Sequence, residues 1–190
     1  VPLVYVSSIA DASGDGSSWQ KAFHSVNAAI QSTSGAIDIW VREGYYPELV
    51  SLRSGVALYG GFSGTESPSN YDLRNPVGRT TKVDRFLVWN VEGVILDGFV
   101  LSGGIDASEL DDHLSMAGFI DCRTATLICQ NCRIIKNGYT PHCQEVLYNP
   151  YEGWKWECWS DKGGGIFLSD TTGIFANCVI DGNEAYYGGG

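Results

Sequence analysis

The chain has 190 residues, of which 44% are hydrophobic, and its formal net charge at pH 7 is −10. That length and apolar content predict a single domain with a sizeable core. The acidic balance argues against nucleic acid or an anionic membrane as a partner. No unbroken apolar run approaches the roughly 18 residues that a membrane-spanning helix needs, so we expect no membrane insertion.

The first predicted element is a helix over residues 18–33. Its apolar residues recur at i, i+4, i+7 and i+11, as Trp19, Phe23, Val26 and Ile30. Ser17 or Ser18 can cap its start by accepting a hydrogen bond from a free backbone N–H. We expect residues 1–34 to form an N-terminal cap on the rest of the chain.

Beyond residue 35 the helical pattern gives way to short β-type runs separated by Gly, Asn and Asp. Two of these runs are near copies, because a shift of 46 residues superimposes them without a gap. The matched pairs are Ile120 and Ile166, Thr126 and Thr172, Ile128 and Ile174, Asn131-Cys132 and Asn177-Cys178, and Ile134 and Ile180. Weaker copies occur in "VILDGFVLSGG", around Phe99 and Leu101, and in "VALYGGFSG". Such self-similarity indicates stacked supersecondary units.

In a parallel stack, equivalent side chains of successive units lie above one another, about 4.8 Å apart. We therefore expect Asn131 and Asn177 to form a ladder at a turn, and Cys132 and Cys178 to fill one interior column. The predicted fold class is all-β: a right-handed parallel β-helix solenoid with an N-terminal capping α-helix and a disulfide-closed hairpin insertion.

The stretches "YVSSIADASGDGSSWQKAFHSVNAAIQSTSGAIDIWVREGYYPE" and "LRSGVALYGGFSGTE" resemble the cap and first coil of bacterial surface or secreted right-handed parallel β-helix proteins. The stretch "GGGIFLSDTTGIFANCVIDGNEAYYGGG" is similar to the repeat of polymorphic outer-membrane-type and other pectate-lyase-like proteins. The resemblance implies the fold but not the activity, because this fold carries lyases, adhesins and inert stalks. In that family a further coil normally follows a segment such as "YYGGG", so we expect more chain or a neighbouring copy to cover the last coil.

The predicted coils extend over residues 35–190 and are interrupted by an insertion at 139–162. "NPYEG" is a turn, and its flanks read as the two strands of a hairpin. Cys143 and Cys158 fall nearly opposite each other across it, so we expect them to form a disulfide. The insertion is rich in aromatic residues: Tyr148, Tyr151, Trp154, Trp156 and Trp159. Either these rings pack against the coils, or they form a platform that binds a glycan or a protein partner.

Calcium is the one cofactor that acidic clusters suggest. Asp11 and Asp15 in "DASGDG" match the start of a calcium loop, although Ala22 stands where the closing carboxylate belongs. A second cluster lies at 106–113 and contains Asp106, Glu109, Asp111 and Asp112. The alternative for the first is a structural turn before the helix, and for the second a solvated run of charges.

A zinc site is a competing interpretation of "CQNC" at 129–132, which is followed by His142 and Cys143. The repeat instead assigns Cys129 and Cys132 to the interior, where cysteine behaves as a small hydrophobic residue. We therefore expect core cysteines and no zinc.

The sequence contains no catalytic set that can be matched residue by residue to the resembled family. We predict a non-enzymatic extracellular or cell-surface module for adhesion, glycan binding or head-to-tail structural assembly, with a glycan or another copy of the chain as partner. The even count of six cysteines suits an oxidising compartment. The alternative is a calcium-dependent polysaccharide lyase or hydrolase, with Arg123 or Arg133 near the carboxylates of 106–113. It requires a basic cleft, which the 12 Lys and Arg residues hardly form.

Overall fold

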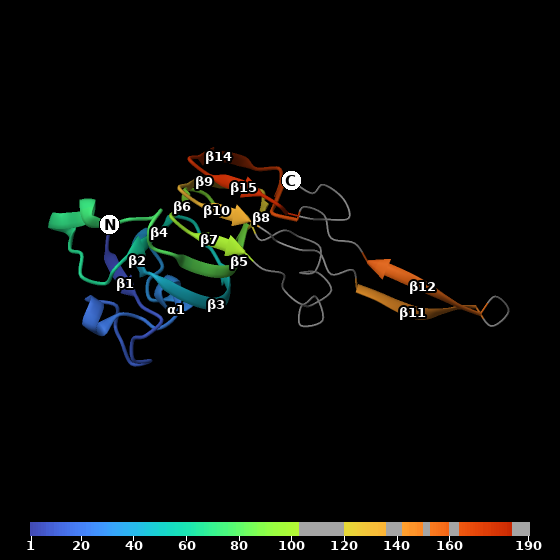
Figure 1. The fold of residues 1–190 in the computed structure, drawn as a ribbon, viewed down its shortest axis with the longest axis horizontal. Coiled ribbons are helices and arrows are strands. Elements are labelled where there is room, and N and C mark those ends of the chain that lie inside the picture. Colours follow the sequence, from blue (N-terminus) through green and yellow to red (C-terminus); the bar gives the residue numbers. More distant parts are fainter. Residues whose placement is uncertain (103–119, 136–141, 150–152, 160–163, 184–190) are drawn as a thin grey trace.

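The computed structural model describes residues 1–102, 120–135 and 164–183, and the backbone of 142–149 and 153–159. Two parallel sheets make up the body (Figure 1). The six-stranded sheet contains, in spatial order, β1 (Leu3–Val6), β2 (Ile37–Arg42), β4 (Val56–Phe62), β6 (Val94–Asp97), β9 (Thr126–Gln130) and β14 (Thr172–Ala176).

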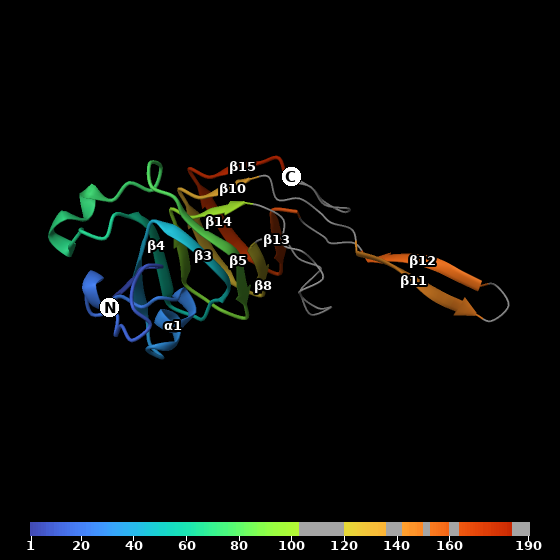
Figure 2. The same cartoon turned by 60° about the horizontal axis from the view of Figure 1, so that its bottom comes forward.

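The seven-stranded sheet faces the first across the core (Figure 2). Its ordered path contains β13 (Ile166–Ser169), β8 (Ile120–Arg123), β5 (Thr81–Trp89), β7 (Val100–Ser102), β10 (Arg133–Ile135) and β15 (Val179–Asp181), and β3 (Gly44–Ser51) pairs with β5. The chain crosses repeatedly from one sheet to the other, so each strand returns beside an earlier one and pairs with it in parallel.

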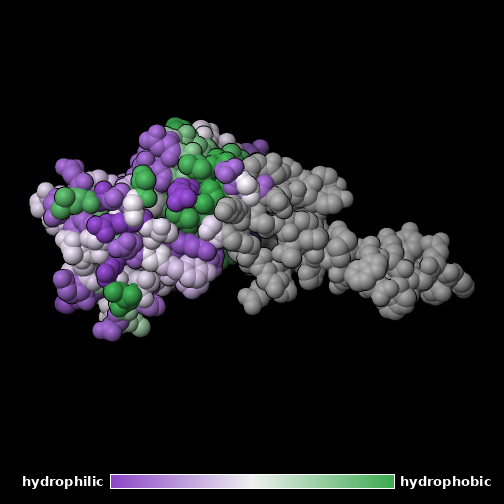
Figure 3. All heavy atoms as spheres, viewed as in Figure 1, coloured by the Kyte–Doolittle hydropathy of each residue, from purple (hydrophilic) through white to green (hydrophobic). Residues whose placement is uncertain are grey.

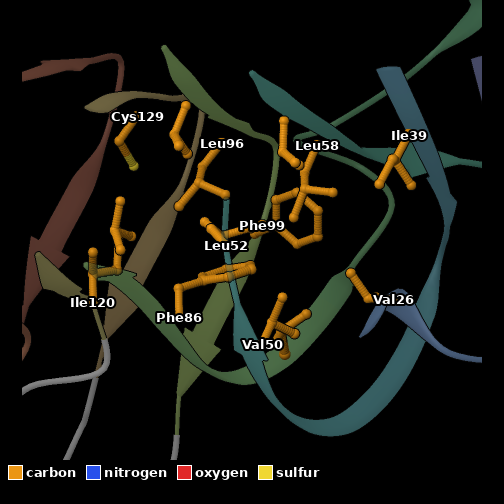
Figure 4. Packing of buried hydrophobic residues seen from close by; sticks show 14 of the residues in the cluster. Val26, Ile39, Val50, Leu52, Leu58, Phe86, Leu96, Phe99, Ile120 and Cys129 are labelled. Carbon is orange, nitrogen blue, oxygen red and sulfur yellow. The ribbon is translucent and has the colours of Figure 1, made fainter. Parts of the chain in front are cut away.

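Alternating side chains from both sheets form one core. In β9 the inward Leu127 and Cys129 are buried, whereas the outward Thr126 and Ile128 are exposed. Figure 4 shows inward residues of the six-stranded sheet, such as Leu58 and Leu96, facing Phe86 and Phe99. The rings of Phe86 and Phe99 meet edge to face with centroids 5.4 Å apart. Burial of this apolar surface is the main force that holds the two sheets together.

The predicted helix over 18–33 is wrong in extent. The structure has a 3-10 turn, η1 (Trp19–Lys21), and a short α-helix, α1 (Val26–Gln31). Between them Phe23 is extended: its N–H donates to the Tyr5 carbonyl at 2.8 Å, and the Ser7 N–H donates to the Phe23 carbonyl at 2.9 Å. This pairing with β1 breaks the helical path, and a new helix begins at its own cap, Ser25, whose Oγ accepts from the Ala28 N–H.

The predicted fold class is also wrong. The structure is a mixed α/β arrangement of two parallel sheets curved into a half-barrel, with few helices, and is not an all-β solenoid. The units are also not a regular repeat, because the sequence separation of paired residues varies along the six-stranded sheet. It is 35 for Leu3 and Asp38, 19 for Ile37 and Val56, 38 for Ala57 and Ile95, 33 for Ile95 and Ile128, and 46 for Ile128 and Ile174.

The shift of 46 residues describes the last two units alone. It is the register of β14 on β9, of β13 on β8 and of β15 on β10. The turn asparagines Asn131 and Asn177 both have positive φ, at 53° and 52°. Asn tolerates this left-handed conformation better than most residues, because its short polar side chain bonds locally. The recurrence of Asn at these corners therefore has a backbone cause.

The insertion forms its own antiparallel sheet of β11 (His142–Asn149) and β12 (Gly153–Trp159) (Figure 2). Cys143 and Cys158 are paired in its backbone register, while their side chains lie outside the described residues. No disulfide is found where side chains are described, and Cys122, Cys129, Cys132 and Cys178 are free thiols. The corrected fold therefore contains no disulfide among the described side chains. Within the described ranges, no helix is long and apolar enough to cross a bilayer.

Candidate binding sites

A small cavity lies where the ends of β1 and β2 meet the loop after β4. Its volume is about 220 Å³, and it is lined by Ser7, Trp19, Gln20, Arg42 and Gly64. These residues come from distant parts of the sequence. Pairing of β1 with β2 brings Ser7 and Arg42 together, because Val6 lies opposite Val41.

The Trp19 ring is held in one orientation. Its indole N–H donates to the Glu66 carbonyl oxygen at 2.7 Å, and the ring packs against Tyr5 and Phe62 with centroids 4.8 and 5.8 Å away. The Glu66 carboxylate is buried and accepts hydrogen bonds from the N–H groups of three loop residues: Ser63, Gly64 and Thr65. Burial raises the pKa of Glu66, but these bonds outweigh it and hold the pKa below its usual value. The loop and the ring thus form one fixed wall.

Two polar side chains of the cavity are unsatisfied. Ser7 is 3% exposed, and its Oγ has no hydrogen-bond partner. Arg42 is partly buried, and its guanidinium has neither a hydrogen bond nor an ion pair with any residue in the described part of the chain. Buried polar groups are normally paired, so a hydroxyl without a partner beside an unpaired guanidinium marks a place for an acceptor.

A second polar centre, on the outer face of the six-stranded sheet, is fully satisfied. Arg74 Nη2 donates to Asp97 Oδ1 at 2.7 Å, and Asn131 and Gln130 each donate to the same carboxylate at 2.8 Å. Arg74 Nε also donates to the Gly60 carbonyl. Burial raises the pKa of Asp97, but its three donors bring the pKa below the usual value. The hydrogen bonds of Arg74 and Asp97 are used within the protein, so this centre is a poor ligand site. The pair instead holds the loop after β4 against the sheet.

A third feature is apolar. A groove of about 260 Å³ runs across the outer face of β6, β9 and β14, and its lining includes Ile95, Ile128 and Ile174, which pair in register. Figure 3 shows hydrophobic side chains gathered in the region that Figure 1 labels β9, β14 and β15. This surface suits an apolar partner better than a polar substrate.

Of the two arginines that the lyase alternative places near the carboxylates of 106–113, Arg123 is engaged elsewhere. Arg123 forms a two-pronged pair with the buried Asp121 at 2.8 and 3.0 Å. Its guanidinium also lies 4.9 Å from the Trp89 ring centroid and 5.2 Å from that of Phe167. A doubly stacked and ion-paired arginine is a poor proton acceptor. Arg133 is exposed on β10.

The candidate calcium ligands divide into two groups. Asp15 accepts hydrogen bonds from the Ser17 N–H and Oγ at 3.0 and 2.6 Å, which lower its pKa, and so it closes a turn. Asp11 is exposed. Asp106, Glu109, Asp111 and Asp112 lie outside the described residues. Where side chains are described, no three His, Cys, Asp or Glu residues are grouped as a metal site.

The aromatic platform stays a prediction. β11 and β12 supply the backbone of Tyr148, Trp154, Trp156 and Trp159, whose side chains are not described, and Tyr151 lies outside the described residues. Sequence reasoning missed the cavity, because it assigned Trp19 to a helix stripe and gave Ser7 and Arg42 no role. No local motif marks these residues, since only strand pairing brings them together.

The ladder residues are stacked but unequal. Asn177 Nδ2 lies 3.5 Å from Asn131 Oδ1, and Asn131 in turn donates to Asp97. Cys132 is buried, with its pKa raised to about 12 by hydrogen bonding with Cys129 and by burial, whereas Cys178 is only partly buried. The later member of each pair is the more exposed one.

No family model matches the chain, and no curated protein or solved structure gives a significant match. The resemblance to bacterial surface β-helix proteins is therefore untested by relatives.

Proposed function

We propose that this chain is a non-enzymatic binding module that assembles with another copy of itself through the surface of β9, β13, β14 and β15, here called the end surface. One observation carries the proposal. Eleven large hydrophobic residues of the described chain are exposed, and five lie on these four strands: Ile128, Leu168, Ile174, Val179 and Ile180. The other six are scattered over the first 77 residues. Ile128 and Ile174 line one apolar groove, and exposed apolar surface of this kind is typical of interaction sites.

The backbone of the end surface is also open on one side. Among the described strands, β14 pairs only with β9, and β15 only with β10. The Thr172 N–H bonds to the Ala125 carbonyl, so in a parallel sheet the N–H groups of Gly173 and Phe175 face the opposite, open side. An open edge of this kind pairs readily with another strand.

A second copy offers the same edge, and a two-fold axis pairs identical surfaces with each other. The head-to-tail contact expected from the sequence is less favourable, because the outer edge of β1 is already bonded. Tyr5 donates to the Gly16 carbonyl and accepts from Phe23. The proposed contact is therefore end to end. The roles in adhesion and the extracellular location rest on the sequence alone and stay predictions.

Sedimentation velocity over a wide concentration range tests this proposal. We expect a monomer–dimer equilibrium that Ile174→Asp shifts to monomer, since a charge in an apolar contact is strongly unfavourable. Ile9→Asp is the matched control, because Ile9 is exposed but lies far from the end surface in sequence and in the fold. A monomer at every concentration, or equal effects of the two variants, would refute the proposal.

A further inference from the structure

The cavity at Ser7, Trp19, Gln20, Arg42 and Gly64 is independent of the end surface. We propose that it binds a small monocarboxylate with a ring-shaped body, the carboxylate on Arg42 and Ser7 and the ring against Trp19. The juxtaposition that carries this is a guanidinium without an ion pair and a buried, unpartnered hydroxyl that line the same small cavity as an indole ring held in place.

The donors define the acceptor. The planar fork of an arginine matches the two oxygens of a carboxylate and forms charge-assisted hydrogen bonds with them. The Ser7 hydroxyl is 3% exposed and can donate once its side chain rotates toward an acceptor. An acceptor that reaches both groups removes the desolvation penalty of a buried unpaired hydroxyl.

Nearby charges favour a monoanion over a phosphate dianion. The Glu66 carboxylate lies directly behind the cavity wall, bonded to the N–H of Gly64, and its lowered pKa keeps it ionised. Glu43 follows Arg42 in sequence, but its carboxylate is paired with Arg79 at 3.4 Å. Each further negative charge on a ligand is therefore repelled more strongly at this site, in a chain of net charge −10.

The wall of the cavity fits a ring. Trp19 is half-exposed and cannot turn freely, because its N–H is bonded to Glu66. A flat indole face binds aromatic rings by stacking and the C–H faces of sugars by dispersion. Gln20, exposed beside it, adds an amide that can bond to a ring substituent. The volume of about 220 Å³ limits the ligand to a single ring.

Gly64 keeps the arginine in place. Its φ of +92° is in the range that favours glycine, and a Cβ at this position would come within 2.9 Å of Arg42 Cδ. Any side chain here would push Arg42 away from its present position. The glycine therefore belongs to the binding site, although it offers the ligand no side chain.

Isothermal titration of the intact chain with two probes tests the proposal. Benzoate presents an aromatic ring and glucuronate a sugar ring, and the methyl ester of each is the neutral control. We expect at least one acid to bind and its ester to bind about tenfold more weakly or not at all, since an ester lacks the charge. Which acid binds identifies the ring.

The variants separate this site from general effects of charge. Arg42→Gln is expected to weaken binding of the acid about tenfold or more, and Ser7→Ala by a smaller factor. Arg133→Gln, on the exposed face of β10, is the matched control and should leave binding unchanged. Binding that does not distinguish acid from ester, an unchanged affinity in Arg42→Gln, or no binding of either acid would each overturn the proposal. None of these results depends on self-association, which the same samples report by sedimentation.

Discussion

The two ends of the paired sheets differ in how their outermost strands are completed. At the end formed by β1 and β3, the segment from Gly16 to Gln31 satisfies the strands. Asn27 accepts from the Ser51 N–H and donates to the Leu49 carbonyl, and Glu48 accepts from the N–H groups of Val26 and Asn27. At the end formed by β13, β14 and β15, aliphatic side chains and one row of backbone groups are open among the described residues.

Because of this difference, aliphatic side chains at equivalent positions are buried in one unit and exposed in the next. Leu101, Ile134 and Ile180 occupy a single column, yet the first two are fully buried and the third is 44% exposed. The same residue type is thus core in one unit and surface in the next. What changes is whether another strand covers it.

The largest expected effect tests this column directly. Ile134→Ala should lower the free energy of unfolding by about 2–5 kcal/mol, because it leaves a cavity in the core. Ile180→Ala should cost under about 1 kcal/mol in the monomer, because the side chain is already half in water. Urea denaturation at low protein concentration measures both. Similar losses of stability would mean that Ile180 is covered in the monomer, which would contradict an open end at β15.

The covered end should be nearly as sensitive at a single carboxylate. Glu48→Ala should cost about 2 kcal/mol, since it removes the acceptor of hydrogen bonds from the N–H groups of Val26 and Asn27 and from the Ser25 hydroxyl. Asp181→Ala, an exposed carboxylate on β15, is the control and should change stability by less than about 0.5 kcal/mol. Thermal unfolding of the two variants side by side gives the difference, and equal shifts would contradict a closed end.

The asparagine ladder offers a smaller contrast. Asn131→Gly should cost about 1 kcal/mol, because Asn131 donates to the buried Asp97 carboxylate at 2.8 Å. Asn177→Gly should be close to neutral, since Asn177 is exposed and its bond to Asn131 is long. Glycine is the proper replacement because both sites have positive φ, where alanine would add strain of its own. A larger melting shift for Asn177→Gly would reverse the contrast.

The smallest change near neutral pH is the change in stability with pH that arises from the titration of Asp97, whose folded pKa lies below its usual value. A depressed pKa contributes stability that is complete above the unfolded pKa of about 3.9 and is lost as the pH falls toward the folded pKa. Stability should therefore decline below about pH 4, with little change between pH 5 and 7 from this group. Asp97→Asn should flatten the acid limb of a stability–pH curve, whereas Asp181→Asn should leave it unchanged. An acid limb as steep in Asp97→Asn as in the parent chain would argue against this role.

The sequence could predict the parts of the fold in which side-chain types recur. The pairing of β9 with β14 and the burial of Cys132 and Ile134 follow from a gapless shift of 46 residues. The fold class and helix boundaries could not be predicted this way. The spacing of paired strands varies with loop length, and Phe23 leaves its helical stripe to bond with β1.

The candidate sites show the same limit. The end surface was partly foreseeable, because its residues repeat those of a buried unit. The cavity was not, since Ser7, Trp19, Arg42 and Gly64 are distant in sequence and their role depends on which polar atoms are left unpaired after folding. The local pattern of a sequence carries no information about which polar atoms lack a hydrogen-bond partner in the folded chain.

The parallel pairing of strands in both sheets determines the order in which backbone amides exchange their hydrogens with solvent. An amide in β4, β6 or β9 is held between two neighbouring strands, so it reaches solvent only after an adjoining strand has moved. Strands at the open end have one such neighbour among those described. Opening should therefore begin at β14 and β15 and proceed strand by strand toward the end closed by Asn27 and Glu48. Hydrogen exchange in the native protein would then be fastest in β14 and β15 and slowest at the opposite end of the sheets. A partner bound to the end surface would slow exchange first in β14 and β15 and then in every strand behind them.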